Sequence, residues 1–280
     1  MLAMQDFLRP LGRTAIMGIV NATGDSFSEN ADSAPESAVD RGCALAEAGA
    51  DILDIGGEST RPGAGEISAE TEISRVIPVL KELKKRLPQM AFSIDTRHAA
   101  VAAAALEAGA QIINDVSMLS DPEMAAVIAR YQAALIIGHF RAAPEIMQNR
   151  EYCNYPDGVA VTVAAELAAA KKSALAAGVL ENNILLDPGI GFSKTAGQCW
   201  ELLRDLATVA PLPALAVGIS RKSFLGWVSG EKEPAKRLGE SLAIELELAS
   251  AKTAIIRTHA VRELHNALSV ATYFRRLKEK

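Results

Sequence analysis

The sequence predicts a single (β/α)8 TIM barrel, an α/β fold whose active site lies at the C-terminal ends of the strands. Three observations point to this fold class. Short apolar segments alternate with amphipathic helical patterns, which is typical of parallel strands covered by helices. One unit of helix, glycine and strand recurs along the 280 residues. Polar side chains follow the candidate strands, as they do at the catalytic rim of a barrel.

The recurring unit is clearest in two stretches. Residues 45–50 read Leu-Ala-Glu-Ala-Gly-Ala and precede an apolar pair and Asp54. Residues 105–110 read Ala-Leu-Glu-Ala-Gly-Ala and precede an apolar pair and Asn114. A weaker copy occupies residues 174–178. In each copy the glycine is expected to end a helix, and the strand that follows delivers a polar side chain.

The strands are predicted from the apolar runs in chain order. Each run is short, and eight of them precede the C-terminal helix. The predicted strands are residues 14–20, 51–55, 90–94, the run from Ile112, 133–137, the run from Ile184, 214–219 and 253–256.

Helices are predicted between the strands by apolar residues at helical spacing. The clearest cover residues 35–48, 68–87 and 261–278. In the second of these, Val76 and Leu80 lie on one face with other apolar residues. The basic end of the last helix complements the helix dipole.

No linker-like or low-complexity segment divides the chain, so one domain over residues 1–280 is predicted. The longest candidate loop, residues 142–156, is interpreted as a loop that extends from the barrel rim and not as a linker between domains. A doubly wound open sheet is the alternative fold. It predicts a glycine-rich dinucleotide-binding loop after the first strand, and the turn at Asn21 lacks the G-x-G-x-x-G spacing of such a loop.

Composition excludes several classes of protein. A net charge of −5 and a pI near 5.5 leave no basic surface for nucleic acid, and no apolar run is long enough to span a bilayer. Residues 1–13 lack the apolar core of a secretory signal. Cys43, Cys153 and Cys199 are odd in number and far apart, which argues against disulfides and a cysteine-based zinc site. We therefore expect a cytoplasmic protein with small-molecule substrates and neither a nucleic-acid nor a membrane partner.

A barrel would bring the polar residues that follow the strands into one mouth. Singly, each has an ordinary explanation as a turn former or a helix N-cap, but their presence at one end of every strand indicates a site. The residues of this rim are Asn21, Asp54, Asp95, Asn114, His139, Asp187, Lys222, Arg257 and His259.

The side chains of the rim favour two kinds of ligand group. Arg257 with His259, and Arg61 across the rim, can hold a phosphate-like anion by charge-assisted hydrogen bonds. Asp95, Asn114 and Asp187 can accept hydrogen bonds from a polar heterocycle that carries several N–H groups. The predicted ligand therefore combines a heterocycle with an anionic group.

Zinc and Schiff-base chemistry are alternatives for the same rim. His139 and His259 each lack a second histidine or carboxylate at ligand spacing, which disfavours zinc. Lys222 has a cationic neighbour, Arg221, that would lower its pKa as in a Schiff-base lysine.

Several sequence blocks, in this order, carry a resemblance to a known family. They are residues 21–28, Asn-Ala-Thr-Gly-Asp-Ser-Phe-Ser; 54–63, Asp-Ile-Gly-Gly-Glu-Ser-Thr-Arg-Pro-Gly; 93–96, Ser-Ile-Asp-Thr; 113–116, Ile-Asn-Asp-Val; 187–192, Asp-Pro-Gly-Ile-Gly-Phe, with Lys194; and 220–224, Ser-Arg-Lys-Ser-Phe. The chain resembles the dihydropteroate synthase family, which is the target of sulfonamides, from about Ile16 to Ala267. The resemblance implies the condensation of 6-hydroxymethyl-7,8-dihydropterin diphosphate with 4-aminobenzoate, Mg²⁺ as the cofactor, and a homodimer.

The resemblance also implies roles for individual residues. Asp95, Lys222 and Arg257 are the expected catalytic residues, and Asn21 is the expected Mg²⁺ ligand. The expected substrate-binding residues are Asp95, Asn114, Asp187 and Lys222 at the pterin, Arg61, Arg257 and His259 at the diphosphate, Thr60, Pro62, Phe192 and Ser220 at the aminobenzoate with Phe27 closing over it, and in addition Asp54 and Arg221.

The chain departs from the family pattern at several positions. They are Gly24 in place of a proline, Asn30 and Ala31 in place of a glycine pair, Gly138 and Phe140 in place of methionines, Ser193 in place of a glycine, Gln198 and Cys199 in place of His-Asn, and Ala260 in place of an aspartate. Two alternatives therefore remain: a divergent pterin-binding paralogue without turnover, and a relative of the pterin-dependent methyltransferases.

Overall fold

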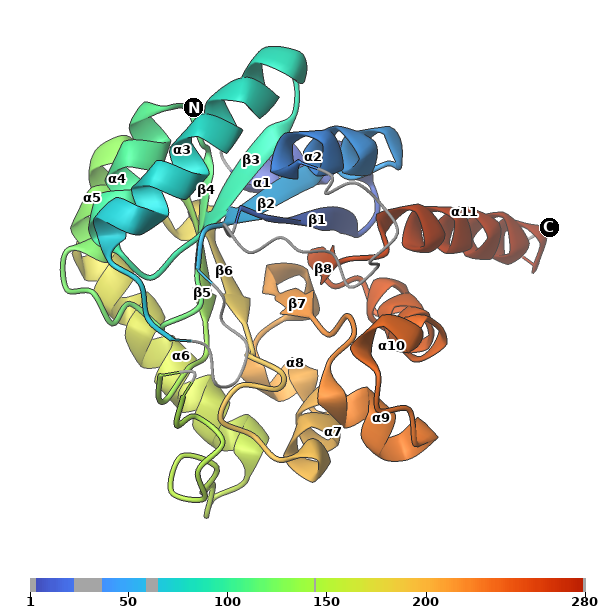
Figure 1. Cartoon of the computed structure of the whole chain (residues 1–280). Helices are drawn as coiled ribbons and strands as arrows, with labels where there is room; N and C mark the ends of the chain where they lie inside the picture. Colours follow the sequence, from blue (N-terminus) through green and yellow to red (C-terminus); the bar gives the residue numbers. More distant parts are fainter. Residues whose placement is uncertain (1–3, 23–36, 59–64, 144, 279–280) are drawn as a thin grey trace.

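The computed structural model describes residues 4–22, 37–58, 65–143 and 145–278. Eight parallel strands form one sheet in the order β6-β5-β4-β3-β2-β1-β8-β7, and a parallel bridge between Leu186 and Leu215 brings its two edges together. The helices surround this sheet (Figure 1). The strands are β1 Ala15–Asn21, β2 Ile52–Gly56, β3 Ala91–Asp95, β4 Ile112–Asp115, β5 Ala134–Gly138, β6 Ile184–Asp187, β7 Ala216–Gly218 and β8 Ile255–Thr258.

The predicted TIM barrel is confirmed, and the alternative of an open doubly wound sheet is wrong. The α-helices are α1 Met4–Leu8, α2 Ala38–Glu47, α3 Ala69–Arg86, α4 Ala99–Glu107, α5 Met124–Tyr131, α6 Val159–Ala176, α7 Ala196–Arg204, α8 Leu206–Val209, α9 Ser223–Ser229, α10 Leu238–Ser250 and α11 Val261–Lys278. Short 3-10 helices are η1 Arg9–Leu11, η2 Glu181–Asn183, η3 Leu212–Ala214 and η4 Pro234–Lys236. One domain over residues 1–280 stays a prediction.

Helix α3 shows how the sequence determines an outer element. It begins after Ser68, whose hydroxyl accepts a hydrogen bond from the backbone N–H of Thr71, and its last turn is basic. Its buried face includes Val76 and Leu80, which belong to the same apolar cluster as the outward-facing Leu53 of β2. An apolar stripe at helical spacing thus packs against the outside of the barrel.

Alternation along the strands divides the barrel interior into an apolar floor and a polar mouth. Successive residues point to opposite faces, so Ile52 and Asp54 of β2 share the inner face, as do Ile112 and Asn114 of β4. The inner residues near the amino ends of the strands form an apolar cluster that includes Met4 of α1. The inner residues near the carboxyl ends are polar, and they supply the candidate site.

The bounds of two strands differ from the prediction by two residues, and the other predicted bounds differ by one residue at most. Residues 214–219 were expected as one strand, but η3 occupies its start and shortens β7. Residues 253–256 were expected as the last strand, whereas β8 runs two residues further and includes Arg257. Arg257 therefore belongs to a strand and not to a loop. Successive side chains of a strand point to opposite faces, so Arg257 points into the barrel while Ile256 points outward. Among the helices in the described ranges, none is long and apolar enough to cross a membrane.

Candidate active site

Four strands bring a buried ionic cluster into the mouth of the barrel. Arg257 of β8 donates from Nε to Asp54 Oδ2 of β2 at 2.6 Å and from Nη2 to Asp95 Oδ2 of β3 at 2.7 Å. Asn114 of β4 donates from Nδ2 to the same Asp54 oxygen at 3.1 Å. The two aspartates and the asparagine are buried. Residues far apart in the sequence thus form one contiguous polar cluster.

Three oxygen atoms of this cluster have no hydrogen-bond donor among the described residues. They are Oδ1 of Asp54, Oδ1 of Asp95 and Oδ1 of Asn114. Buried acceptors are nearly always paired, because an unpaired one costs about 1–3 kcal/mol. A ligand with several N–H groups would supply the missing donors, which is the kind of heterocycle that the sequence predicts.

Asp95 is the electrostatically perturbed carboxylate of the cluster. Burial raises the pKa of Asp95 to about 7, although the Arg257 cation opposes this rise. The neighbouring charge of Asp54 contributes to this rise. Burial disfavours the Arg257 cation as well, but the two aspartates hold the pKa of Arg257 above its ordinary value. The cluster therefore keeps a permanent cation beside a carboxyl group that titrates near neutral pH.

A second group of side chains lies on the β6 and β7 side of the mouth. Asp187 ends β6, and its Oδ1 accepts a hydrogen bond from the Gly189 N–H at 2.8 Å. The Lys222 ammonium donates to the Ile190 carbonyl and lies 4.5 Å from the centre of the Phe192 ring. Burial lowers the pKa of Lys222 to about 8, against the attraction of Asp187. Burial raises the pKa of Asp187.

The loops after β7 and β8 meet at Ser220 and His259. The Ser220 hydroxyl oxygen lies 3.2 Å from the backbone nitrogen of His259 and 3.2 Å from its Nδ1. Arg221 has a left-handed backbone at φ 61°, held by a hydrogen bond from its N–H to the Ser241 hydroxyl at 3.0 Å. At Gly138, which departs from the family pattern, the backbone packs closely against the β4 side of the barrel: a Cβ there would lie 2.9 Å from the Cα of Val116.

Several predicted residues lie outside the described ranges. They are Phe27, Thr60, Arg61 and Pro62. Asn21 is described: it is the last residue of β1, and its side chain is exposed. Its backbone pairs in register with Gly56 of β2. The described rim thus contains Asn21 and the predicted pterin-side residues.

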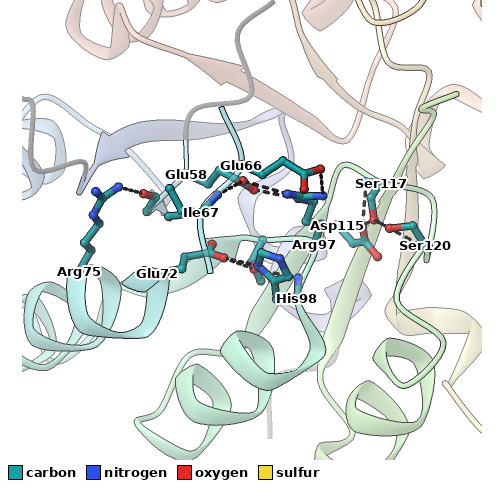
Figure 2. A network of polar contacts seen from close by, with 12 residues as sticks. Glu58, Glu66, Ile67, Glu72, Arg75, Arg97, His98, Asp115, Ser117 and Ser120 are labelled. Atoms are coloured by element: carbon teal, nitrogen blue, oxygen red, sulfur yellow. Dashed lines mark hydrogen bonds and ion pairs between the residues drawn. The ribbon is translucent and has the colours of Figure 1, made fainter. Parts of the chain in front are cut away.

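The sequence reasoning missed an ion-pair network beside the mouth. Figure 2 shows Arg97 between two glutamates: it donates from Nε and Nη2 to Glu58 at 2.9 and 3.0 Å, and from Nη1 to Glu66 at 2.8 Å. The Ile67 N–H also donates to Glu58 at 3.1 Å. Arg97 therefore joins Glu58, which follows β2, to Glu66, which precedes α3. These partners are 31 and 39 positions from Arg97, so local sequence patterns carry no signal for them.

Comparison with known proteins agrees with this geometry. A family model described as pterin binding enzyme matches residues 17–259. The chain belongs to the pterin-binding enzyme family. A dihydropteroate synthase of Synechocystis is 39% identical over 263 residues, which cover 92% of this chain and 89% of that one.

Two solved members of the pterin-binding enzyme family share the whole fold. A Xanthomonas albilineans dihydropteroate synthase with 4-aminobenzoic acid superposes with a TM-score of 0.85 and 36% identity, covering 95% of this chain and 94% of that one. The enzyme from the same organism in complex with 7,8-dihydropteroate gives a TM-score of 0.83 and 33% identity, covering 95% of both chains.

Proposed function

We infer that the protein is a dihydropteroate synthase. In this reaction 6-hydroxymethyl-7,8-dihydropterin diphosphate and 4-aminobenzoate give 7,8-dihydropteroate and diphosphate. The observation that carries the inference is the set of unpaired oxygens on Asp54, Asp95 and Asn114 beside Arg257, because it offers acceptors to a heterocycle next to a cation for an anion. The likeness to named dihydropteroate synthases supports the same conclusion and does not favour a paralogue without turnover or a methyltransferase.

The chemistry needs charge stabilisation more than a strong base. The bond between the exocyclic methylene carbon of the pterin and the diphosphate oxygen breaks, and its electron pair leaves with diphosphate. The aniline nitrogen of 4-aminobenzoate then forms the new C–N bond with its lone pair and loses one proton. That nitrogen is already neutral near pH 7. The protein therefore has to stabilise a developing cation and a departing anion.

Residues of the cluster have complementary roles in this step. The Asp95 carboxylate stabilises positive charge that develops on the pterin, and Asn114 and Asp187 hold the ring. Arg257 contacts the aspartates through Nε and Nη2, so its Nη1 nitrogen can donate to a diphosphate oxygen. Arg61 and His259 are proposed to assist Arg257, and Lys222 to hold the pterin beside Phe192.

Asn21 is proposed to hold Mg²⁺. The ion prefers oxygen ligands, keeps several waters and often shares substrate phosphates, so one exposed amide oxygen suits it. Asn21 is exposed on β1, which pairs with the strand that carries Arg257. When bound, the ion would neutralise charge on the leaving diphosphate. We expect chelation with EDTA to abolish turnover and added Mg²⁺ to restore it.

A coupled assay of diphosphate release tests the proposed function. The protein is mixed with the pterin diphosphate, 4-aminobenzoate and Mg²⁺, and diphosphate and dihydropteroate are both measured. We expect equal amounts of the two products and no dihydropteroate when 4-aminobenzoate is omitted. Tight pterin binding without release of diphosphate would instead identify a binding protein.

The pH dependence of kcat/KM follows from two perturbed groups. Asp95 has to be ionised, and its pKa is raised to about 7, so the rate should rise as pH increases through that value. Lys222 has to be protonated, and its pKa is lowered to about 8, so the rate should fall above that value. A narrow bell-shaped profile is the expected result. In Lys222→Arg the cation persists to higher pH, so the fall of kcat/KM should move to higher pH. A fall that stays near pH 8 in this variant would show that Lys222 does not cause it.

A homodimer is proposed from an exposed apolar row on α11. Val270, Tyr273, Phe274 and Leu277 are 70, 67, 56 and 52% exposed, and their spacing places them on one face of the helix. Figure 1 shows α11 extending outward from the barrel. Light scattering should give twice the chain mass of 29.6 kDa, and Tyr273→Asp should give the single mass.

The matched control is Val161→Asp, which changes an exposed apolar residue on α6 and should leave the dimer intact. A monomeric wild-type protein would refute the homodimer. We also propose that the protein acts in the cytoplasm on small molecules, in keeping with its acidic composition and its widely spaced cysteines.

A further inference from the structure

The loop between β6 and α7, residues 188–195, is built around a buried ammonium group. Lys194 is 3% exposed, and its Nζ donates to the carbonyls of Gly189 and Phe192 at 3.0 Å each. The same Nζ lies 2.9 Å from Nδ1 of His139, which follows β5. Lys194 thus links both ends of the turn between Gly189 and Phe192 to the neighbouring strand.

His139 connects this ammonium to helix α6. Its Nε2 lies 2.8 Å from Glu166 Oε2, and the imidazole is buried. Burial lowers the pKa of Lys194 to about 7, so below that pH its side chain is an ammonium and has only donors. A carboxylate has only acceptors, so the neutral imidazole carries its proton on Nε2 and accepts from Lys194 at Nδ1. Burial, together with the adjacent Lys194 cation, lowers the pKa of His139 to about 4, which favours the neutral ring. Both ring nitrogens are therefore engaged by protein groups.

The contacts continue until they return to the same loop. Arg141 donates from Nη2 to Glu166 Oε1 at 2.6 Å, and its guanidinium carbon lies 4.0 Å from the centre of the Tyr155 ring. The Tyr155 hydroxyl donates to the Ser193 carbonyl at 3.0 Å. Ser193 precedes Lys194 in the chain, so the circuit Lys194–His139–Glu166–Arg141–Tyr155–Ser193 is closed.

The backbone of the loop needs such a restraint. Gly189 has φ +64°, and a Cβ there would lie 2.1 Å from the His139 carbonyl oxygen, so the loop passes very close to the end of β5. Ser193 has φ 50°, a left-handed conformation that costs a non-glycine residue free energy. In this circuit the Tyr155 hydroxyl binds the Ser193 carbonyl, and the Lys194 ammonium binds the carbonyls of the preceding turn. A strained loop is thereby fixed from both sides.

We propose that Lys194, held by His139 and Glu166, is a positioning residue that keeps Asp187 and Phe192 in the geometry that binds the pterin. This inference rests on the proposed function, because it assigns the loop to the pterin side of that site. Lys194 does not have to touch the substrate: it acts on the loop carbonyls of Gly189 and Phe192. Gly189 donates its N–H to Asp187, and the Phe192 ring lies against the Lys222 ammonium.

The test removes the ammonium while keeping the length of the side chain. In Lys194→Met we expect KM for the pterin diphosphate to rise at least about tenfold, with kcat at saturation within about threefold of the wild type. Calorimetry with 6-hydroxymethylpterin should show the same loss of affinity. The matched control is Lys171→Met, which removes a lysine paired with Glu181 on the outside of the protein and should change neither constant.

A spectroscopic measurement separates positioning from general destabilisation. The ¹⁵N shifts of the His139 imidazole, assigned with His139→Gln, should show a proton on Nε2 and a hydrogen-bonded Nδ1 in the wild type. Lys194→Met should move the Nδ1 signal to that of a nitrogen without a donor. Glu166→Gln, at a side chain 30% exposed, provides a second variant: the amide oxygen still accepts from Nε2–H, so the tautomer should stay the same, but the lost charge weakens this bond and should raise KM about threefold.

Two results would overturn the inference. One is a pterin affinity in Lys194→Met within about twofold of the wild type, in a folded protein. The other is a wild-type His139 with its proton on Nδ1. Because calorimetry needs no turnover, a wild type that releases no diphosphate would refute the proposed function and leave this comparison of pterin affinities standing.

Discussion

Asp95→Asn is expected to lower kcat by about 100-fold or more while pterin affinity stays within about tenfold of the wild type. The amide keeps the shape of the side chain and one oxygen acceptor, so the ring can still bind. It loses the negative charge that faces the developing cation on the pterin methylene carbon. In the wild type that charge lies in a buried site, 2.7 Å from Arg257, where little water screens it.

Single-turnover kinetics together with calorimetry separate the two effects of Asp95→Asn. The matched control is Asp51→Asn, which removes a carboxylate at the opposite end of the barrel, where Asp51 pairs with Arg13 at 2.7 Å. That control should leave kcat unchanged. If Asp95→Asn turned over at the wild-type rate, Asp95 would have no part in the chemistry.

Arg257→Ala should weaken the binding of diphosphate about 100-fold and also destabilise the protein. The guanidinium is the partner of Asp54 at 2.6 Å and of Asp95 at 2.7 Å, so its removal leaves two buried carboxyl groups without a cation. Removing one partner of a buried ion pair typically costs about 3–5 kcal/mol of the free energy of unfolding. Product inhibition by diphosphate measures the first effect, and denaturant unfolding measures the second.

The stability loss in Arg257→Ala should depend on pH in a defined direction. Without the cation, the pKa of buried Asp95 rises above the already raised value of about 7, because burial is no longer opposed. A carboxyl group whose pKa is raised on folding destabilises the protein as pH increases from its unfolded pKa to its folded pKa. The loss of unfolding free energy in Arg257→Ala, relative to the wild type, should therefore be larger at pH 8 than at pH 5. An unaltered inhibition constant for diphosphate would remove Arg257 from anion binding.

The sequence predicted the fold because the signals for it are local. The apolar runs and the repeated helix, glycine and strand unit depend on neighbouring residues, and all eight predicted strands are present. The convergence of Asp54, Asp95 and Asn114 followed from the rule that parallel strands end at one rim. Local signals did not show that Arg257 lies inside β8, since no turn residue marks the end of the preceding apolar run.

The contacts that the sequence did not reveal join residues far apart in the chain. Glu166 reaches His139 across 27 positions and Arg141 across 25, from a helix whose own pattern explains only its apolar face. Lys194 stood in a recognised sequence block, yet its partners depend on how the β6–α7 loop folds back on β5. Side-chain partners of this kind depend on tertiary structure.

A crystal structure of the protein with 6-hydroxymethylpterin would show whether the N–H groups of the pterin donate to Asp54, Asp95 and Asn114, at the oxygens that lack a donor among the described residues. We predict that the ring lies in the barrel mouth with N–H groups within hydrogen-bond distance of Asp54, Asp95 and Asn114, and with its hydroxymethyl group directed toward Arg257. A pterin bound elsewhere, with those oxygens still lacking a donor, would contradict the account.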